Sequence, residues 1–185
     1  MNPSEAPDSP STVFPTSKNK LHLGCGNKIL PDYVNVDICQ TPGIDLVWDV
    51  NEGIPFADNS FSEALAVDFI EHIQPQNAIY LMNEVYRVLQ PEGVFKIHVP
   101  EAPGISAYQD PTHICFWNEE SFDYYLLNNF RRERYGVYYG ITAKFQRVSL
   151  TRTRHQWKKF FKTGNLNYLS NFLLDVELKA IKEPN

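Results

Sequence analysis

The sequence predicts an α/β domain built on a mainly parallel β-sheet, and three observations support that prediction. Short apolar segments rich in β-branched residues alternate with turns along the chain. One segment, residues 78–89, has the apolar spacing of an amphipathic helix. The first apolar segment runs into the turn Gly24-Cys25-Gly26, and the next three end at or beside an acidic residue. Such alternation is typical of a parallel sheet, and 185 residues are enough for one domain.

The first 18 residues are set apart by their composition, with four prolines and four serines. Such a segment buries too little apolar surface to offset the entropy lost on ordering it. We therefore expect residues 1–18 to form a disordered N-terminal tail and residues 19–185 to form a single domain.

Four strands are expected in the first part of the domain. The first runs from Lys20 to Gly24, and the connector after it is short and contains Pro31, which leaves no room for a long helix. The other three strands are expected at residues 33–38, 44–50 and 61–68, each bounded by turn residues.

The second part of the domain is expected to mix helices and strands. A helix should run from Pro75 to a stop before Pro91, because its apolar residues recur at intervals of four, three and four residues and share one face. A second helix should follow Asn118, which suits an N-cap. The remaining strands are expected at residues 94–99, 145–153 and 172–180, with the arginine-rich segment 145–153 at an edge of the sheet.

The ends of the first four strands carry the residues that point to a ligand. In open α/β sheets, ligands bind at the carboxyl ends of the strands. The residues expected there are Gly24, Cys25, Gly26, Asp37, Asp49 and Asp68. A dinucleotide site would need a third glycine before a full helix, and Ile29 stands in its place. An acid after the second strand suits the two hydroxyls of a ribose, and an acid after the third suits the amino group of an adenine.

Four motifs occur in the order found in one enzyme family. The motifs are Leu21 to Asn27, residues 54–61 (IPFADNSF), residues 69–73 (FIEHI) and residues 88–95 (VLQPEGVF). They resemble motif I and the LPF-x-D-x-SF, VLEHI and VLKPGGxL motifs of class I S-adenosylmethionine-dependent methyltransferases. The chain is most similar to small type 11 members found beside sugar-modifying genes, which also resemble it at Asp110-Pro111-Thr112-His113.

The resemblance implies a Rossmann-like class I methyltransferase fold and a site for S-adenosylmethionine, with S-adenosylhomocysteine as product. Gly24 and Gly26 would hold the amino-acid part of the cofactor, with Cys25 as the small residue between them. Asp37 would bind the ribose and Asp49 the adenine, and Asp68 would complete the cofactor site. The chain departs from the family in two places. Glu92 stands where a glycine is common, and the helix between the first two strands is nearly absent.

A hydroxyl acceptor would require a base, and a histidine near neutrality is the natural one. His72, beside Glu71, and His113 are the candidates because they follow the fourth and fifth strands. Alternatively, His72 and Glu71 cap the helix near Pro75, and His113 orders its loop together with Asp110 and Thr112. The other three histidines, His22, His98 and His155, are expected to be structural.

Composition limits the other possibilities. The three cysteines lack the spacing of a zinc site, so no metal is expected, and their odd number argues against a disulfide framework and for a reducing cytoplasm. Neither a membrane-spanning segment nor a signal peptide is visible. The net charge is −5, yet residues 131–162 carry ten basic residues and one acid amid several aromatics. That stretch suits either an anionic acceptor or an ordinary solvated edge.

We therefore expect a methyltransferase that acts on a small-molecule or glycan-linked acceptor, with oxygen slightly preferred as the methylated atom. The basic, aromatic stretch makes a nucleic-acid methyltransferase the first alternative, which the negative net charge disfavours. The second alternative is a cofactor-binding regulatory protein of the same fold without catalysis of its own.

Overall fold

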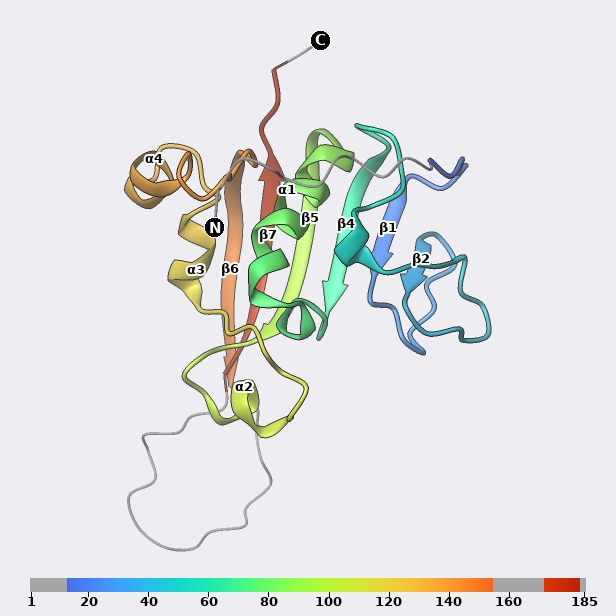
Figure 1. The fold of residues 1–185 in the computed structure, drawn as a ribbon, viewed down its shortest axis with the longest axis horizontal. Coiled ribbons are helices and arrows are strands. Elements are labelled where there is room, and N and C mark those ends of the chain that lie inside the picture. Colours follow the sequence, from blue (N-terminus) through green and yellow to red (C-terminus); the bar gives the residue numbers. More distant parts are fainter. Residues whose placement is uncertain (1–12, 155–171, 184–185) are drawn as a thin grey trace, which may run out of the picture.

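The computed structural model describes residues 13–154 and 172–183, which form a seven-stranded sheet with helices packed on it (Figure 1). The strand order is β3-β2-β1-β4-β5-β7-β6. The strands are β1 (Lys20–Leu23), β2 (Val34–Asp37), β3 (Leu46–Val47), β4 (Phe61–Val67), β5 (Leu89–Pro100), β6 (Phe145–Arg154) and β7 (Phe172–Ala180).

Strands β1 to β5 pair in parallel, so their carboxyl ends lie at one edge of the sheet. Strand β7 is inserted between β5 and β6 and runs antiparallel to both. The predicted mainly parallel α/β fold is therefore confirmed, and β6 forms an edge strand as expected.

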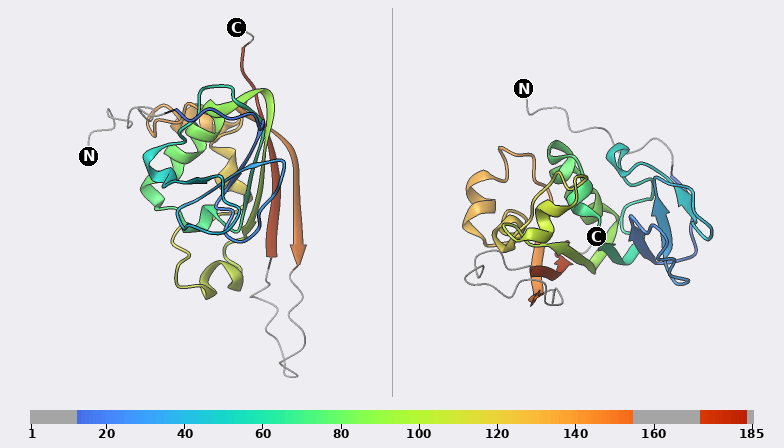
Figure 2. Two further views of the ribbon diagram at one scale, coloured as in Figure 1. Left: turned by 90° about the vertical axis from the view of Figure 1, so that its right-hand side faces the viewer. Right: turned by 90° about the horizontal axis from the view of Figure 1, so that it is seen from below.

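The helices gather on one face of the sheet. Figure 2 shows α1 (Ala78–Val88), α3 (Glu119–Asp123) and α4 (Phe130–Tyr135) on the same side of the strands. The remaining helical segments are α2 (Ile105–Gln109) and the short 3₁₀ turns η1 (Val50–Glu52), η2 (Ile70–His72) and η3 (Pro75–Asn77). As predicted, Pro75 opens the helical region and Asn118 caps α3, accepting a hydrogen bond from the Ser121 amide at 3.0 Å. Within the described residues, no helix is both long and apolar enough to cross a membrane.

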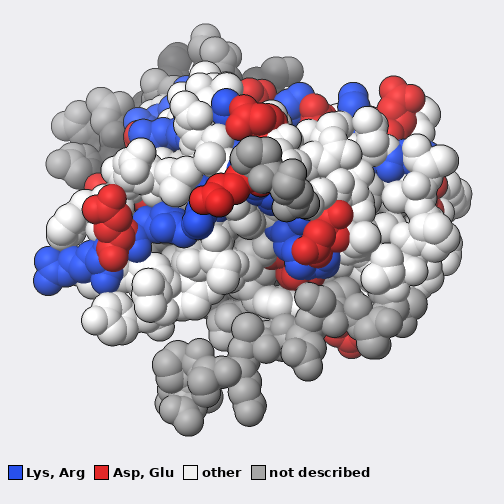
Figure 3. All heavy atoms as spheres, turned by 90° about the horizontal axis from the view of Figure 1, so that it is seen from above, with Lys and Arg blue, Asp and Glu red and all other residues white. Residues whose placement is uncertain are grey.

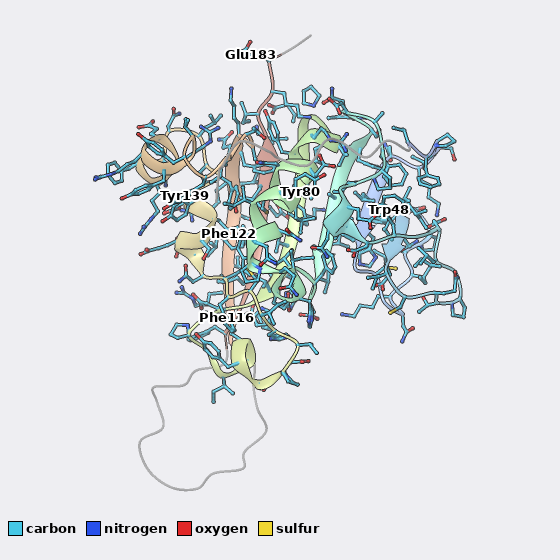
Figure 4. The ribbon with its side chains drawn as sticks, viewed as in Figure 1. Trp48, Tyr80, Phe116, Phe122, Tyr139 and Glu183 are labelled. Atoms are coloured by element: carbon cyan, nitrogen blue, oxygen red, sulfur yellow. The ribbon has the colours of Figure 1, made fainter. Side chains whose placement is uncertain are left out.

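The hydrophobic core lies between these helices and the sheet. On β5, Phe95, Ile97 and Val99 are buried beneath the helices, whereas alternate residues face the other side and are half-buried. Phe122 of α3, labelled in Figure 4, is fully buried and stacks on Trp117 with ring centroids 5.2 Å apart.

No helix forms in residues 24–33, between β1 and β2, which agrees with the reduced helix expected there. A polar cluster around Asn35 takes its place on that side of the sheet. The side-chain Nδ2 of Asn35 donates to the carbonyl oxygens of Leu30 and Tyr33, and Asn35 Oδ1 accepts from the backbone amide of Leu30. These bonds hold the connector against β2 without a helix.

The structure corrects several expected boundaries. The ordered chain starts before residue 19, because the Phe14 amide donates to the Pro55 carbonyl at 2.9 Å and Lys18 pairs with Asp45 at 2.8 Å. The third strand is only Leu46–Val47, since the residues after it turn into η1. Residues 1–12 of the expected tail and His155 lie outside the described residues.

Glu92, which replaces a common glycine, adopts a φ of 64°. This left-handed conformation favours glycine and costs other residues roughly 1–2 kcal/mol. Its side chain pairs with Lys179 at 2.7 Å, so the turn forms despite the substitution.

A buried ion pair fastens α1 to the segment before β4. Arg87 binds both carboxylate oxygens of Glu84, at 2.7 and 2.8 Å, and donates to the carbonyls of Ile54 and Phe56. Glu84 is 5% exposed and accepts the Ile54 amide at 2.8 Å. The ion pair lies within α1, and its bonds to Ile54 and Phe56 are made only while the two segments stay together.

We predict that Arg87→Met destabilises the fold by about 3 kcal/mol, because it leaves the Glu84 carboxylate buried without its counter-charge. Urea unfolding monitored by circular dichroism measures the loss. Lys179→Met is the matched control, since its partner Glu92 is largely exposed, and it should cost less than about 1 kcal/mol. Equal losses in the two variants would contradict this role of Arg87.

Candidate functional site

The turn after β1 is bound directly to the acid at the end of β2. The Gly26 amide donates to Asp37 Oδ2 at 2.8 Å, and the Cys39 amide donates to Asp37 Oδ1 at 2.9 Å. A carboxylate oxygen has two lone pairs. Asp37 therefore holds the turn in place and keeps one acceptor position on each oxygen for a ligand.

The two glycines of this turn play different parts. Gly24 has a φ of 61°, and a Cβ built on it would lie 2.0 Å from the Phe69 ring. Gly26 has a φ of 50°, and nothing lies within 4 Å of its Cβ position. Gly24 is thus required by packing inside the protein, whereas Gly26 borders open space at the strand ends.

The thiol of Cys25 points into the protein. The residue is 2% exposed, and burial raises the pKa of the thiol to about 11 because the thiolate is poorly solvated there. Its amide donates to the Val36 carbonyl at 3.2 Å. The turn therefore presents backbone atoms to a ligand, and not a reactive sulfur.

The other two acids also lie at this edge. Asp49 caps η1, and its Oδ1 accepts from the amide and the side chain of Asn51 at 2.9 and 2.8 Å. Asp68 directly follows β4 with a φ of 50° and lies 3.4 Å from Lys28 Nζ. All the residues predicted at the strand ends are therefore found at the carboxyl edge of the sheet.

A second group of side chains lies beyond Asp68. Glu71 and His72 belong to η2, and His113 comes from the loop before α3. The backbone carbonyl of Glu71 accepts the amides of Ile114 and Cys115, both at 2.9 Å, and so fastens that loop to η2. The rings of His72 and His113 consequently meet at 4.8 Å between centroids.

The alternatives for the two histidines have different outcomes. Neither His72 nor Glu71 caps the helix near Pro75, because the residues at the starts of η3 and α1 make no side-chain cap bond. Instead, His72 Nδ1 lies 3.2 Å from the Thr112 carbonyl. The loop-ordering bond expected for His113 does exist, because its Nδ1 lies 3.3 Å from the Ala107 carbonyl.

These side chains line a cleft of about 370 Å³. Its lining residues are Asp68, Glu71, His72, His98, Pro100, Ser106, Gln109, Asp110, His113 and Leu173. Eight of these ten residues have polar or charged side chains. The volume lies within the range of small-molecule sites.

His98, expected to be structural, is also part of this cleft. Its Nδ1 lies 2.7 Å from Asp175 of β7 and its Nε2 lies 3.7 Å from Asp68. One signal was available in the sequence, because His98 stands near the carboxyl end of the fifth strand, where ligands are expected. The sequence did not indicate that β7, which supplies Asp175, pairs with β5.

Glu71 is electrostatically the most unusual residue of the group. Its side chain is 3% exposed, and neither carboxylate oxygen has a hydrogen-bond partner among the described residues. Burial, assisted by the negative charges of Asp68 and Asp110, raises the pKa of this carboxyl group to about 7. A proton or a cation at Glu71 is therefore more favourable than at an exposed carboxylate.

Three arginines in the described part of the basic stretch pair with acids from elsewhere in the chain. Arg131 pairs with Glu120, Arg147 with Glu119 at 3.2 Å, and Arg152 with both oxygens of Glu101 at 2.6 and 2.5 Å. Figure 3 shows blue and red side chains next to one another on the face viewed from above. Residues 155–162 of the stretch lie outside the described part.

The comparisons with known proteins agree with this architecture. The type 11 methyltransferase family, described as a methyltransferase domain, matches residues 21–97. No curated protein sequence matches the chain.

Several solved structures share the fold. A SAM-dependent methyltransferase from Archaeoglobus fulgidus is 17% identical with a TM-score of 0.58, over 88% of this chain and 86% of that one. The 1,6-didemethyltoxoflavin-N1-methyltransferase of Burkholderia thailandensis, solved with S-adenosylhomocysteine, is 15% identical with a TM-score of 0.57, over 88% and 71%. A 16S rRNA (adenine(1408)-N(1))-methyltransferase mutant from Catenulisporales acidiphilia is 9% identical with a TM-score of 0.53, over 91% and 88%.

The residues at the strand ends fit S-adenosylmethionine. Asp37 has two free acceptor positions for a ribose diol, and the Cβ position of Gly26 opens onto empty space. The hydrogen bonds to Asp49 from described residues use only Oδ1, which leaves Oδ2 for an amino group. The acids Asp68 and Glu71 suit the positive charge of a sulfonium.

The two glycines allow a matched test of the turn. We predict that Gly26→Ala costs about 1–2 kcal/mol of stability, from the positive φ alone, and weakens S-adenosylhomocysteine binding at least tenfold. Gly24→Ala should be much less stable, because its methyl group collides with Phe69. Thermal melts and isothermal titration measure both effects. A Gly26→Ala protein that binds like the wild type would show that the turn faces elsewhere.

The acid at the end of β2 gives a second prediction. Asp37→Ala should weaken S-adenosylhomocysteine binding by about 1.5–3 kcal/mol, roughly 10- to 150-fold, through lost charged hydrogen bonds. Isothermal titration measures the affinity, and Asp32→Ala, an exposed acid nearby, is the control. If both variants kept wild-type affinity while folded, the ribose assignment would be wrong.

Proposed function

We propose that this chain, whose residues 21–97 match a methyltransferase domain, is an S-adenosylmethionine-dependent methyltransferase that methylates a hydroxyl of a small or glycan-linked acceptor. The acceptor would bind in the cleft between η2, the carboxyl end of β5 and the loop of His113. The cofactor brings a methyl group already activated on sulfur, so the protein mainly has to orient the acceptor and remove its proton.

One observation supports this proposal above the others. The cleft includes Asp68, the last of the strand-end acids that fit the cofactor, and it also includes His72 and His113. In both rings Nδ1 faces a backbone carbonyl, which can only accept a hydrogen bond. Nδ1 therefore carries the proton, and Nε2 is left as a base. Either histidine can receive the hydroxyl proton while the acceptor oxygen takes the methyl group.

The character of the lining supports a hydroxyl-rich acceptor. Carboxylates such as Asp68 and Asp110, together with Ser106 and Gln109, supply hydrogen-bond acceptors and donors around the cleft. A sugar offers several hydroxyls to such a lining. The proposal includes a reducing, cytoplasmic setting, because the cysteines are free thiols.

A nucleic-acid acceptor is the second candidate, and the basic stretch is the feature that favours it. The pairing of Arg131, Arg147 and Arg152 with acids weakens it, because paired arginines contribute little to phosphate binding. A regulatory protein without catalysis is the third candidate. A protein without catalysis would not need two histidine rings held in a fixed orientation beside the residues that fit the cofactor.

Transfer of a labelled methyl group tests the proposal. The full chain is incubated with methyl-labelled S-adenosylmethionine and separate panels of free sugars, nucleotide sugars, oligosaccharides, RNA and DNA. We expect labelling in a sugar panel, with the label on oxygen. Salt-sensitive labelling of RNA or DNA alone would support the second candidate. Cofactor binding without any labelling would support the third.

The histidines give a sharper prediction. We predict that one of the two variants His72→Asn and His113→Asn removes the base. That variant should lower the rate of methyl transfer about 10²–10⁴-fold and leave S-adenosylhomocysteine affinity unchanged. Lys179→Met, far from the base, is the control. Full activity in both histidine variants would rule out a histidine base.

A further inference from the structure

The carboxylate of Glu71 accepts no hydrogen bond from the described residues. Its side chain is 3% exposed, it lines the cleft, and both oxygens lack a hydrogen-bond donor. Burying a carboxylate without a donor or a cation costs several kcal/mol. The fold nevertheless holds Glu71 at this position, because its backbone carbonyl binds two amides of the neighbouring loop. The carboxylate can therefore bind a cation or a hydrogen-bond donor that enters the cleft.

The two histidines beside it are oriented in a specific way. His72 Nδ1 and His113 Nδ1 lie 3.2 and 3.3 Å from the carbonyls of Thr112 and Ala107. The free lone pair of each ring is consequently on Nε2, and His113 Nε2 lies 3.9 Å from Glu71 Oε1. Histidines that bind metals nearly always have this support, with the other ring nitrogen donating to a carbonyl or carboxylate.

We propose that Glu71, His72 and His113 form a binding site for a divalent transition-metal ion of the zinc type. One ligand atom from each residue lies within 4.8 Å of the others. Ligands of a tetrahedral zinc ion are about 3.3–3.5 Å apart, so the three side chains have to close by roughly an ångström around it. Two imidazoles and one carboxylate leave a fourth position of a tetrahedral ion unfilled, and all three residues line the cleft.

The ligand set selects the class of ion. Imidazole nitrogen suits zinc, copper, iron and nickel, whereas magnesium and calcium prefer oxygen ligands only. The expectation of no metal was based on cysteine spacing alone, and the three cysteines take no part in this cluster. His72 is adjacent to Glu71 in sequence, but His113 is 41 residues further along the chain. Only the folded loop brings the three together.

The metal site does not depend on the proposed function, because binding of the ion needs neither cofactor nor acceptor. The two proposals do share the Nε2 atoms of His72 and His113. An ion at Nε2 of both histidines would occupy the lone pairs that otherwise act as a base. It would instead bind the acceptor hydroxyl at its fourth position and lower the pKa of that hydroxyl.

Metal titration of the full chain tests the site. The protein, freed of metal by a chelator and without an affinity tag, is titrated with zinc chloride in a calorimeter and with cobalt(II) in a spectrophotometer. We expect one ion per chain, competition between the two metals, and the visible absorption of cobalt in a low-symmetry nitrogen and oxygen site. Magnesium should not compete. Absence of zinc binding to the folded wild type would overturn the proposal.

Variants locate the ion. Glu71→Gln and His113→Asn should each weaken zinc binding at least about tenfold. His98→Asn is the matched control, because His98 lines the same cleft beside a carboxylate but lies outside the cluster, and it should bind zinc like the wild type. Glu71→Gln should fold well, since its carboxylate has no hydrogen bond to lose among the described residues. Undiminished binding in folded Glu71→Gln and His113→Asn would also overturn the proposal, whatever the methyl-transfer assays show.

Discussion

The parallel pairing of β4 with β1 on one side and β5 on the other is the constraint on which the rest of the structure depends. Ala66 of β4 lies beside Leu23 of β1 and Ile97 of β5, so all three strands end at nearly the same level. The chain leaving β1 continues toward β2, and the chain leaving β4 continues toward β5. The residues that fit the cofactor, after β1 and β2, and the histidines, after β4 and β5, therefore meet at Asp68, where the strand order reverses.

The cofactor side could be predicted from the sequence because each of its residues directly follows a strand. Once the strands are parallel, Gly26, Asp37 and Asp68 must come close together. The histidine side was only partly predictable. Its shape depends on contacts between distant segments, such as Trp117 Nε1 to the Ile70 carbonyl at 3.3 Å, and His98 became part of it through β7. The charge count has the same limit, since it cannot show that Arg152 is paired with Glu101.

Two features near the cleft cost stability, and the surrounding structure holds both in place. Asp68 has a positive φ, and Glu71 is buried without a donor among the described residues. Such costs persist where neighbouring bonds leave the backbone no alternative, and they concentrate at functional sites. Here the Asp68 amide donates to the His98 carbonyl, and the Glu71 carbonyl accepts two amides. The positive φ of Glu92 has no such link to the site, because Glu92 lies near the start of β5, away from the carboxyl ends of the strands.

The insertion of β7 between β5 and β6 has a consequence for how the protein folds. Pairs such as His98 with Asp175 join residues far apart in sequence, and contacts of this kind form slowly. During synthesis, β1 to β5 can assemble before residues 172–180 leave the ribosome, but β5 then has an uncovered edge and β6 has no partner strand. Leu173 and Asp175 complete the wall of the cleft and the His98 pair. A nascent chain could therefore build its cofactor turn early, yet it would gain a finished acceptor cleft only when its last strand arrives.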